Sequence, residues 1–220
     1  MLPTAAIFDF GGVFTSPVWT SFDAFGTAVG LPSGALMRAF IAADEGEGQI
    51  PDFHHFEIGR MTEADFFARM RVRAEAEAGP LPAWPSDPAA AREIMIGTLE
   101  RNEEMLDAAA RIRRHHPTAI CTNNAREWSA WRDLVRAHEF DVVVDSCEEG
   151  VRKPDPEIYL RTCARLGVAP EQALFVDDLP HNVEGARAVG LHAIRFTTTE
   201  ETLTAVHRAF PHIFQEAAVE

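Results

Sequence analysis

The chain has 220 residues, of which 46% are hydrophobic and 25% are charged, and this composition is that of a folded domain rather than of a disordered chain. Its formal net charge of -14 argues against nucleic acid and anionic membranes as partners, because both would repel an acidic surface. Three cysteines form no CxxC pair, the amino terminus has no basic segment, and no apolar run reaches transmembrane length, so we expect a cytoplasmic protein with reduced thiols.

Five short apolar runs alternate with helix-like patterns along the chain. The runs are residues 5–8, 118–121, 142–144, 173–176 and 192–196. Apolar residues at helical spacing occur between most of them, at 103–112, 156–166 and 183–190. Short continuous apolar strands are typical of a parallel sheet that is buried on both faces. The alternation therefore predicts a doubly wound α/β sheet with right-handed crossovers.

The connection between the first and second runs contains helix signals and no strand-like run. Thr62 and Asp65 form a capping-box pattern, and Gly79 is a stop signal for the helix that follows them. Asp87 and Pro88 are typical of an N-cap and a first helical residue. We therefore predict an inserted helical domain. The predicted boundaries are 1–15 and 100–220 for the α/β core and 16–99 for the insertion.

Polar residues stand where three of the apolar runs end. Asp9 follows the first run, Thr122 and Asn123 follow the second, and Asp177 and Asp178 follow the fourth. Ligands of open α/β sheets bind at the carboxyl ends of the strands, so these side chains should converge at one edge. Three carboxylates in a small space repel one another, and a divalent cation removes that penalty. Ligands that are all oxygen favour Mg²⁺.

Four segments in chain order resemble the motifs of the haloacid dehalogenase-like (HAD) hydrolases, most of which are Mg²⁺-dependent phosphatases. The segments are IFDFGGVFT, ICTNN, GVRKPDPEIY and LFVDDLPHNVEGA. The first is most similar to the motif of sugar-1-phosphate phosphatases and of relatives of the N-terminal phosphatase domain of soluble epoxide hydrolase. The resemblance implies a Rossmann-like sheet of strand order 5-4-1-2-3 and identifies the insertion as a type-one α-helical cap. We expect a small phosphate ester as substrate and a monomer or weak homodimer.

The resemblance also implies roles for residues of these motifs. Asp9 is expected to be the nucleophile that takes the phosphoryl group as an aspartyl-phosphate. Lys153 is expected to neutralise charge on Asp9 and on the transferring group. The implied catalytic and phosphate-binding residues are Asp9, Gly12, Thr122, Asn123 and Lys153. The implied Mg²⁺ ligands are Asp9, the backbone carbonyl of Gly11 and Asp178, with Asp177 and Asn182 holding the water ligands of the metal.

Gly11 departs from the family pattern, because most of these phosphatases have a second aspartate there as general acid and base. Such a group typically contributes about 10²–10⁴-fold. Two hypotheses follow. The substrates have good leaving groups, such as anomeric sugar, acyl or aryl phosphates, or another side chain replaces the missing acid. The candidates for that replacement are Asp44, Glu45, Glu47, His54, His55 and His181.

Two other functions stay open. A 2-haloacid dehalogenase also uses an aspartate nucleophile without the second aspartate, but it typically has an aromatic residue at that position and no acidic metal pair like Asp177 and Asp178. A catalytically weak homologue that binds a phosphorylated ligand is disfavoured by the retention of Asp9 and Lys153. Asp9 alone is also explained by a turn, and Lys153 alone by a solvated loop. The order of the four motifs favours the phosphatase.

Overall fold

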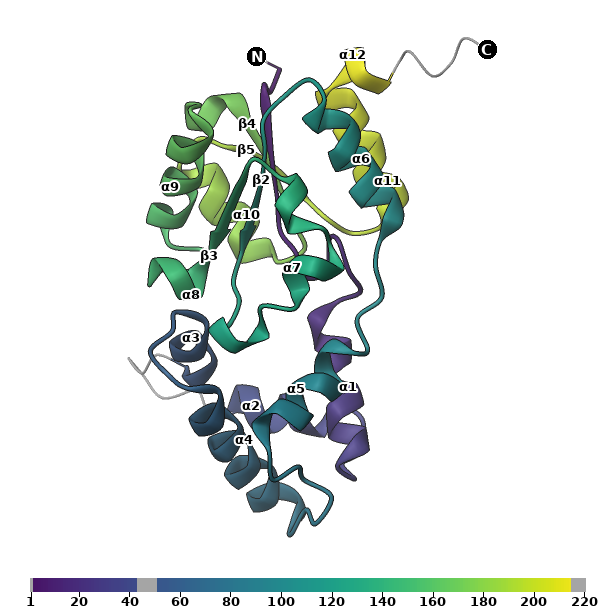
Figure 1. Cartoon of the computed structure of the whole chain (residues 1–220), viewed down its shortest axis with the longest axis vertical. Coiled ribbons are helices and arrows are strands. Elements are labelled where there is room, and N and C mark those ends of the chain that lie inside the picture. Colours follow the sequence, from purple (N-terminus) through teal and green to yellow (C-terminus); the bar gives the residue numbers. More distant parts are fainter. Residues whose placement is uncertain (1, 43–50, 215–220) are drawn as a thin grey trace.

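The computed structural model describes residues 2–42 and 51–214, and its centre is a five-stranded parallel sheet (Figure 1). The strands are β1 (Ala5–Phe8), β2 (Thr118–Thr122), β3 (Val142–Asp145), β4 (Ala173–Asp177) and β5 (His192–Arg195). Their order is β3-β2-β1-β4-β5, which is the predicted order read from the other edge. In the register of the sheet, Ile7 of the central strand lies opposite Ala119 on one side and Phe175 on the other.

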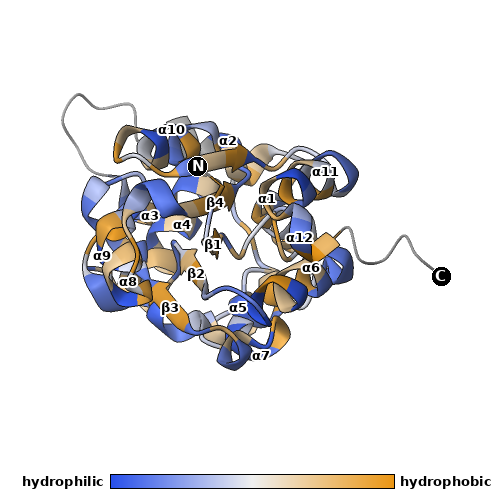
Figure 2. Ribbon diagram, turned by 90° about the horizontal axis from the view of Figure 1, so that it is seen from above, coloured by the Kyte–Doolittle hydropathy of each residue, from blue (hydrophilic) through white to orange (hydrophobic). Residues whose placement is uncertain are grey.

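Side chains of successive strand residues point to opposite faces and enter two separate apolar clusters. Phe8 packs with Met105 and Val206 on one face, whereas Ile7 packs with Tyr159 and other buried residues on the opposite face. This is the alternation that strand geometry requires. Seen from above, hydrophobic strand residues lie between layers of helices whose outer faces are largely hydrophilic (Figure 2).

Three helices of the core are close to those that the spacing predicts: α6 (Glu103–Arg113), α9 (Pro156–Leu166) and α10 (Pro180–Ala188). The core also contains four helices that were not predicted, α7 (Trp131–Leu134), α8 (Ser146–Glu149), α11 (Thr199–Ala209) and α12 (Pro211–Phe214), and short 3₁₀ turns at Arg126–Trp128, Ala137–Glu139 and Pro170–Gln172. The helix α10 begins at Pro180, before the predicted 183–190, since its polar first turn has no apolar periodicity. The strand β5 is also less buried than predicted, because it is an edge strand with His192 and Arg195 exposed.

The predicted helical insertion after β1 is confirmed. It contains α1 (Val18–Ala28), α2 (Ala35–Ala42), α3 (Asp52–Glu57), α4 (Glu63–Ala78) and α5 (Pro88–Ile96). The Thr62 side chain accepts the N–H of Asp65 at the start of α4, and Gly79 ends that helix with φ 82°. The Asp87 side chain accepts the N–H of Ala89 at the start of α5. The capping signals in the sequence therefore mark real helix ends.

Two segments join the insertion to the core, and they run side by side. Thr15 and Arg101 form an antiparallel bridge. The backbone N–H of Ser16 donates to the carbonyl of Glu100 at 2.7 Å. The insertion lies beyond the carboxyl ends of the strands (Figure 1), so it covers the edge where the polar residues converge. None of the helices in the described ranges is long and apolar enough to cross a membrane.

Candidate active site

Asp9 lies at the carboxyl end of the central strand and is 7% exposed. Its backbone N–H continues the sheet by donating to the carbonyl of Val176 at 2.8 Å, and its Oδ1 accepts the N–H of Phe10 at 2.7 Å. The Phe10 ring packs on Trp131 with 4.9 Å between ring centroids. These contacts hold the carboxylate in one position, as a nucleophile requires.

Lys153 is fully buried between two carboxylates of neighbouring strands. Its Nζ lies 2.7 Å from Oδ1 of Asp9 and 2.7 Å from Oδ2 of Asp177. Burial lowers the pKa of the Lys153 ammonium, but the attraction of Asp177 and Asp9 outweighs burial and raises that pKa above its ordinary value. The lysine is therefore a permanent cation beside Asp9.

The loop that carries Lys153 is held by the side chain of Asn123, at the end of β2. The Asn123 Nδ2 donates to the carbonyl of Lys153 at 3.0 Å, and its Oδ1 accepts the N–H of Lys153 at 2.8 Å. The peptide bond from Lys153 to Pro154 is cis. The family resemblance implied that Asn123 binds phosphate, whereas this positioning role of its side chain gave no sequence signal.

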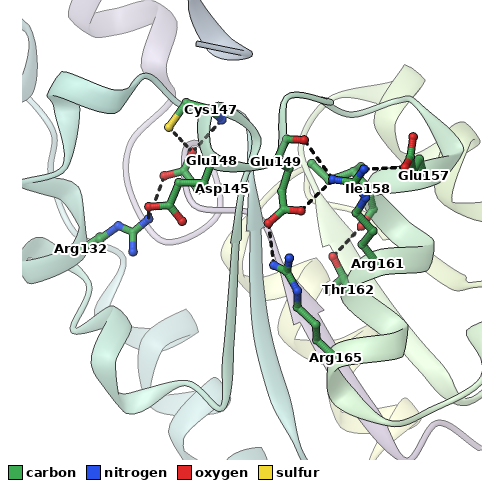
Figure 3. A network of polar contacts seen from close by, with 10 residues as sticks. All are labelled: Arg132, Asp145, Cys147, Glu148, Glu149, Glu157, Ile158, Arg161, Thr162 and Arg165. Atoms are coloured by element: carbon green, nitrogen blue, oxygen red, sulfur yellow. Dashed lines mark hydrogen bonds and ion pairs between the residues drawn. The ribbon is translucent and has the colours of Figure 1, made fainter.

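The two helices that flank the same loop are tied together by ion pairs (Figure 3). Glu149, the last residue of α8, is 2.9 Å from Arg161 and 2.7 Å from Arg165, both on α9. On the other side, Arg132 of α7 lies 3.3 Å from Asp145 at the end of β3. The loop that holds the buried lysine is thus supported at both of its ends.

Three carboxylates converge as the sequence predicted. Oxygen atoms of Asp9, Asp177 and Asp178 lie within 4.8 Å of one another. The pKa of Asp9 is raised to about 8, and burial is the main cause. The charge of Lys153 opposes this shift, and the carboxylates of Asp177 and Asp178 add to it. Burial and the charge of Asp177 likewise raise the pKa of Asp178 to about 6. A divalent cation at this cluster would stabilise all three carboxylates.

Two details of the cluster fit a hard cation such as Mg²⁺. Asn182 donates from Nδ2 to Oδ1 of Asp177 at 3.0 Å, while its buried Oδ1 has no hydrogen-bond partner within the described part of the chain. Gly12 has φ +79°, and a Cβ there would lie 2.6 Å from Cγ of Asp178. Only glycine leaves room for this carboxylate. The oxygen donors present are those that Mg²⁺ prefers.

A cavity of about 180 Å³ opens above the cluster, between the core and the insertion. The predicted site residues in its wall are Asp9, Gly11, Thr122, Asn123, Lys153, Asp178 and Asn182. The other two support this wall, since Gly12 contacts Asp178 and Asp177 contacts Lys153. The structure therefore brings all the predicted site residues together, and their roles stay predictions.

Only some candidates for a replacement acid reach the cavity. Among the described residues, His54 of α3 and His181 of α10 line it, and His55 does not. Asp44, Glu45 and Glu47 lie outside the described residues. Burial lowers the pKa of His54 to about 4, with the charge of Arg152 and the neighbouring imidazole of His181 as further causes, so the imidazole of His54 is neutral at pH 7.

Two features of the cavity wall were not anticipated from the sequence. Val18, at the start of α1, fills the place beside Gly11: a Cβ at position 11 would overlap Cγ2 of Val18. Arg152, the neighbour of Lys153, pairs with the buried Glu57 of α3 through Nε and Oε2 at 2.6 Å. Contacts between the insertion and the core have no sequence periodicity, so no pattern could reveal them.

The cysteines and the two tryptophans near the site have structural explanations. All three cysteines are free and buried, and burial raises the pKa of the Cys121 thiol to about 12, so it is no nucleophile at neutral pH. Trp128 donates from Nε1 to Glu63 at 2.9 Å, and Trp131 packs on Phe10.

The strand order, the helical insertion after β1 and the acidic cluster below it define a Rossmann-like α/β protein that works at the carboxyl edge of its sheet. The chain belongs to the haloacid dehalogenase-like hydrolases, because the profile of that hydrolase family matches residues 3–190. The predicted family and fold are thereby confirmed.

Several curated proteins are similar in sequence. The chain is 31% identical over 202 residues to acyl-CoA dehydrogenase family member 10 of Mus musculus, covering 89% of this chain and 18% of that protein. It is 29% identical to bifunctional epoxide hydrolase 2 of Sus scrofa, covering 93% of this chain and 38% of that protein. The chain thus spans only a minor part of these two relatives. Phosphatase MT3486 of Mycobacterium tuberculosis is 27% identical, with 93% and 92% covered.

Solved structures show the same fold. A HAD-like family hydrolase from Porphyromonas gingivalis has a TM-score of 0.67 at 24% identity, covering 96% of this chain and 98% of that one. A HAD family enzyme from Bacteroides thetaiotaomicron, in complex with magnesium and inorganic phosphate, has a TM-score of 0.60 at 18% identity, with 89% and 94% covered. L-2-haloacid dehalogenase from Xanthobacter autotrophicus has a TM-score of 0.62 at 21% identity, with 92% and 81% covered.

Proposed function

We propose that the protein is a Mg²⁺-dependent phosphatase that hydrolyses small phosphate monoesters through an aspartyl-phosphate on Asp9. The observation that carries this proposal is the arrangement of Lys153 between Asp9 and Asp177, with Asp178 beside them. This arrangement offers a nucleophile, a fixed cation and oxygen donors for a metal in one buried place. The relatives named as phosphatases support it.

In the first half-reaction a carboxylate oxygen of Asp9 attacks phosphorus, and the bond from phosphorus to the ester oxygen breaks with its electron pair going to the leaving group. Lys153 neutralises the charge on Asp9 and on the transferring group. Thr122 and Asn123 line the place where phosphoryl oxygens would bind. Asp9, Asp178 and the carbonyl of Gly11 would hold Mg²⁺, which supplies further positive charge at the phosphoryl oxygens.

In the second half-reaction water attacks the aspartyl-phosphate, releases inorganic phosphate and restores Asp9. Since no carboxylate stands at position 11 to take a proton, the proton that the water loses leaves with the inorganic phosphate. Asp177 and Asn182 keep Lys153 in place throughout, because Asn182 donates to Asp177 and Asp177 pairs with Lys153. Without an acid at position 11, the rate of the first half-reaction is expected to depend on the substrate's own leaving group, whereas the second half-reaction is the same for every ester.

The dehalogenase alternative has less support. The likeness to L-2-haloacid dehalogenase is one of fold alone at 21% identity. The cluster of Asp9, Asp177 and Asp178 is suited to a cation, and a dehalogenase has no use for one. Retention of the buried Lys153 also argues against a protein that only binds a phosphorylated ligand.

Turnover of p-nitrophenyl phosphate with Mg²⁺ and with EDTA tests the proposal. We expect hydrolysis that requires Mg²⁺ and falls by more than about 10³-fold in Asp9→Asn. The control is Asp107→Asn, which changes an exposed aspartate of α6 and should leave the rate unchanged. Full activity in Asp9→Asn would rule out the aspartyl-phosphate. Chloride release from 2-chloropropionate that survives EDTA would favour the dehalogenase.

A further inference from the structure

The cavity above Asp9 has a polar floor and a largely apolar upper wall. The floor is the cluster of motif residues at the strand ends. Apolar side chains of the insertion and of neighbouring segments form the wall: Val18, Trp19, Phe53, Phe56, Met95, Ile96, Leu99 and Trp128. A phosphoryl group on the floor would direct its leaving group toward this wall.

The apolar surface extends to the phosphoryl site itself. Where most related phosphatases have a carboxylate, this chain has Gly11, and the space that its side chain would occupy holds Cγ2 of Val18. A methyl group therefore stands at the place from which a proton would be given to the leaving oxygen. Compared with a carboxylate at position 11, Gly11 with Val18 beside it gives the leaving group an apolar contact in place of a polar one.

Several polar groups of the wall already have partners within the protein. Glu57 pairs with Arg152 at 2.6 Å, so the charges of both are balanced. The hydroxyl of Ser21 accepts that of Thr98 at 3.1 Å. A sugar leaving group would bring several hydroxyls against such a wall, and each buried hydroxyl without a partner is unfavourable.

His54 and His181 also line the cavity. Burial lowers the pKa of both imidazoles, with Arg152 as a further cause, so both are neutral at pH 7. Within residues 2–42 and 51–214, the wall therefore offers no uncompensated charge to a second anionic group of a substrate, and what it offers is mainly apolar surface.

The size of the cavity limits the leaving group. Its volume is about 180 Å³. The phosphoryl group on the floor occupies part of this volume, and a cavity of about 150 Å³ with apolar walls takes up benzene, so the space left for the leaving group is at most that of one ring or a short alkyl chain. Trp19 lies in the wall of the cavity and is 40% exposed, so it lies between the cavity and solvent.

We propose, building on the phosphatase function above, that the site takes phosphate monoesters whose leaving group is apolar, with the bulk of one ring or a short alkyl chain. The apolar wall with Val18 beside Gly11 recognises it. Water supplies the proton to the leaving oxygen, since no carboxylate stands there.

Hexyl phosphate and glucose 6-phosphate provide a matched test, because both are esters of primary alcohols. The sugar is the more acidic alcohol, so leaving-group chemistry alone favours it. Each methylene buried in an apolar wall contributes about fourfold, so we expect kcat/KM to be about tenfold or more higher for hexyl phosphate. Equal values, or a preference for the sugar, would overturn the inference while leaving the phosphatase function intact. Failure to hydrolyse these two esters and phenyl phosphate would overturn both.

The variant Trp19→Ser tests whether the apolar wall causes the preference for hexyl phosphate. We expect it to lower kcat/KM for hexyl phosphate by about fivefold, mainly through KM, and to lower that for glucose 6-phosphate by a clearly smaller factor. Because Trp19 is exposed, we expect the replacement to leave the fold intact, and an unchanged melting temperature would verify this. The control is Leu160→Ser, which removes a 47% exposed leucine of α9 away from the cavity. An equal loss for both esters, or no loss for hexyl phosphate, would contradict the role of the wall.

Discussion

Gly11 and Val18 together determine what stands beside the phosphoryl site. Position 11 has no positive φ, so its backbone accepts other residues, and the obstacle is Cγ2 of Val18. We expect Gly11→Asp alone to destabilise the fold by about 1–3 kcal/mol through overpacking. Combined with Val18→Ala, it should gain room for a general acid.

The double variant is therefore expected to hydrolyse glucose 6-phosphate up to about 10²-fold faster than Val18→Ala alone. Phenyl phosphate, whose leaving group needs little protonation, should gain much less. Steady-state rates with both esters measure this. A folded double variant that shows no gain with the sugar ester would mean that a carboxylate at position 11 cannot reach the leaving oxygen.

His54 makes a pH-dependent contribution to stability. Burial holds its pKa at about 4 in the folded protein, below the ordinary value of 6.5. As the pH falls from 6.5 toward 4, the unfolded chain binds a proton that the folded chain does not, so the free energy of unfolding decreases. The titrating or charged groups that act on it are Arg152, His181 and His55.

We expect His54→Asn to reduce the decrease in the free energy of unfolding that occurs as the pH falls. Between pH 7 and 4.5 its free energy of unfolding should fall by about 1–2 kcal/mol less than that of the unmodified protein, allowing for partial exposure of the ring. Urea unfolding at several pH values measures the difference. The same change at His115, an exposed histidine, is the control, and parallel pH curves for all three proteins would contradict the prediction.

Site residues at the ends of strands could be predicted from the sequence. Residues that belong to the site only through tertiary contacts could not. Asp9 and Asp178 were visible because an apolar run stops at a carboxylate. The role of the Asn123 side chain depends on a loop that is 30 positions away in sequence. Val18 and Glu57 reach the site only because the insertion folds back over the sheet. A single sequence does not reveal that these residues are close in space to the site.

A largely buried ion pair between Glu57 and Arg152 links helix α3 to the core. The side chains of Glu57 and Arg152 are 6% and 16% exposed. Removing the charge of Glu57 would leave Arg152 poorly solvated and without a counter-ion, so Glu57→Gln should lower the free energy of unfolding by about 2–4 kcal/mol. Faster hydrogen exchange in α3 should accompany the change.

An exposed pair provides the comparison for this prediction. Arg101 and Glu103 lie 3.0 Å apart with side chains that are 32% and 60% exposed, and Glu103→Gln should cost less than about 1 kcal/mol. Equal losses in urea unfolding for the two variants would show that the buried pair contributes no more than a surface pair.

The elements themselves followed from local patterns. Capping residues such as Thr62 and Asp87 marked helix starts, and the apolar runs marked the strands. The short helices α7, α8 and α12 and the 3₁₀ turns were not predicted, because a segment of three or four residues has too little periodicity to be recognised. The longer helix α11 (Thr199–Ala209) was also not predicted from the sequence. The position of the edge strand β5 was predicted correctly, but its burial was overestimated. Burial depends on having neighbouring strands on both sides, and β5 has one on one side.

The whole molecule has apolar clusters on both faces of the sheet and a third in the insertion. The third is not confined to the insertion: Ala125 and Trp128, from the segment after β2, pack with Phe56 and Phe66. Trp128 also donates from Nε1 to Glu63 of α4 at 2.9 Å. The core thus completes the apolar cluster of the insertion.

This sharing predicts that the insertion and the core unfold together. Far-UV circular dichroism and tryptophan fluorescence should report one coincident transition in urea. Trp128→Ala removes the shared ring and leaves Glu63 without that donor, so it should destabilise the insertion selectively by about 3–5 kcal/mol and separate the two transitions. Trp19→Ala, which removes an exposed tryptophan of the insertion, should leave them coincident. A single transition in Trp128→Ala would mean that the paired segments around Thr15 and Arg101 couple the two parts without the shared cluster.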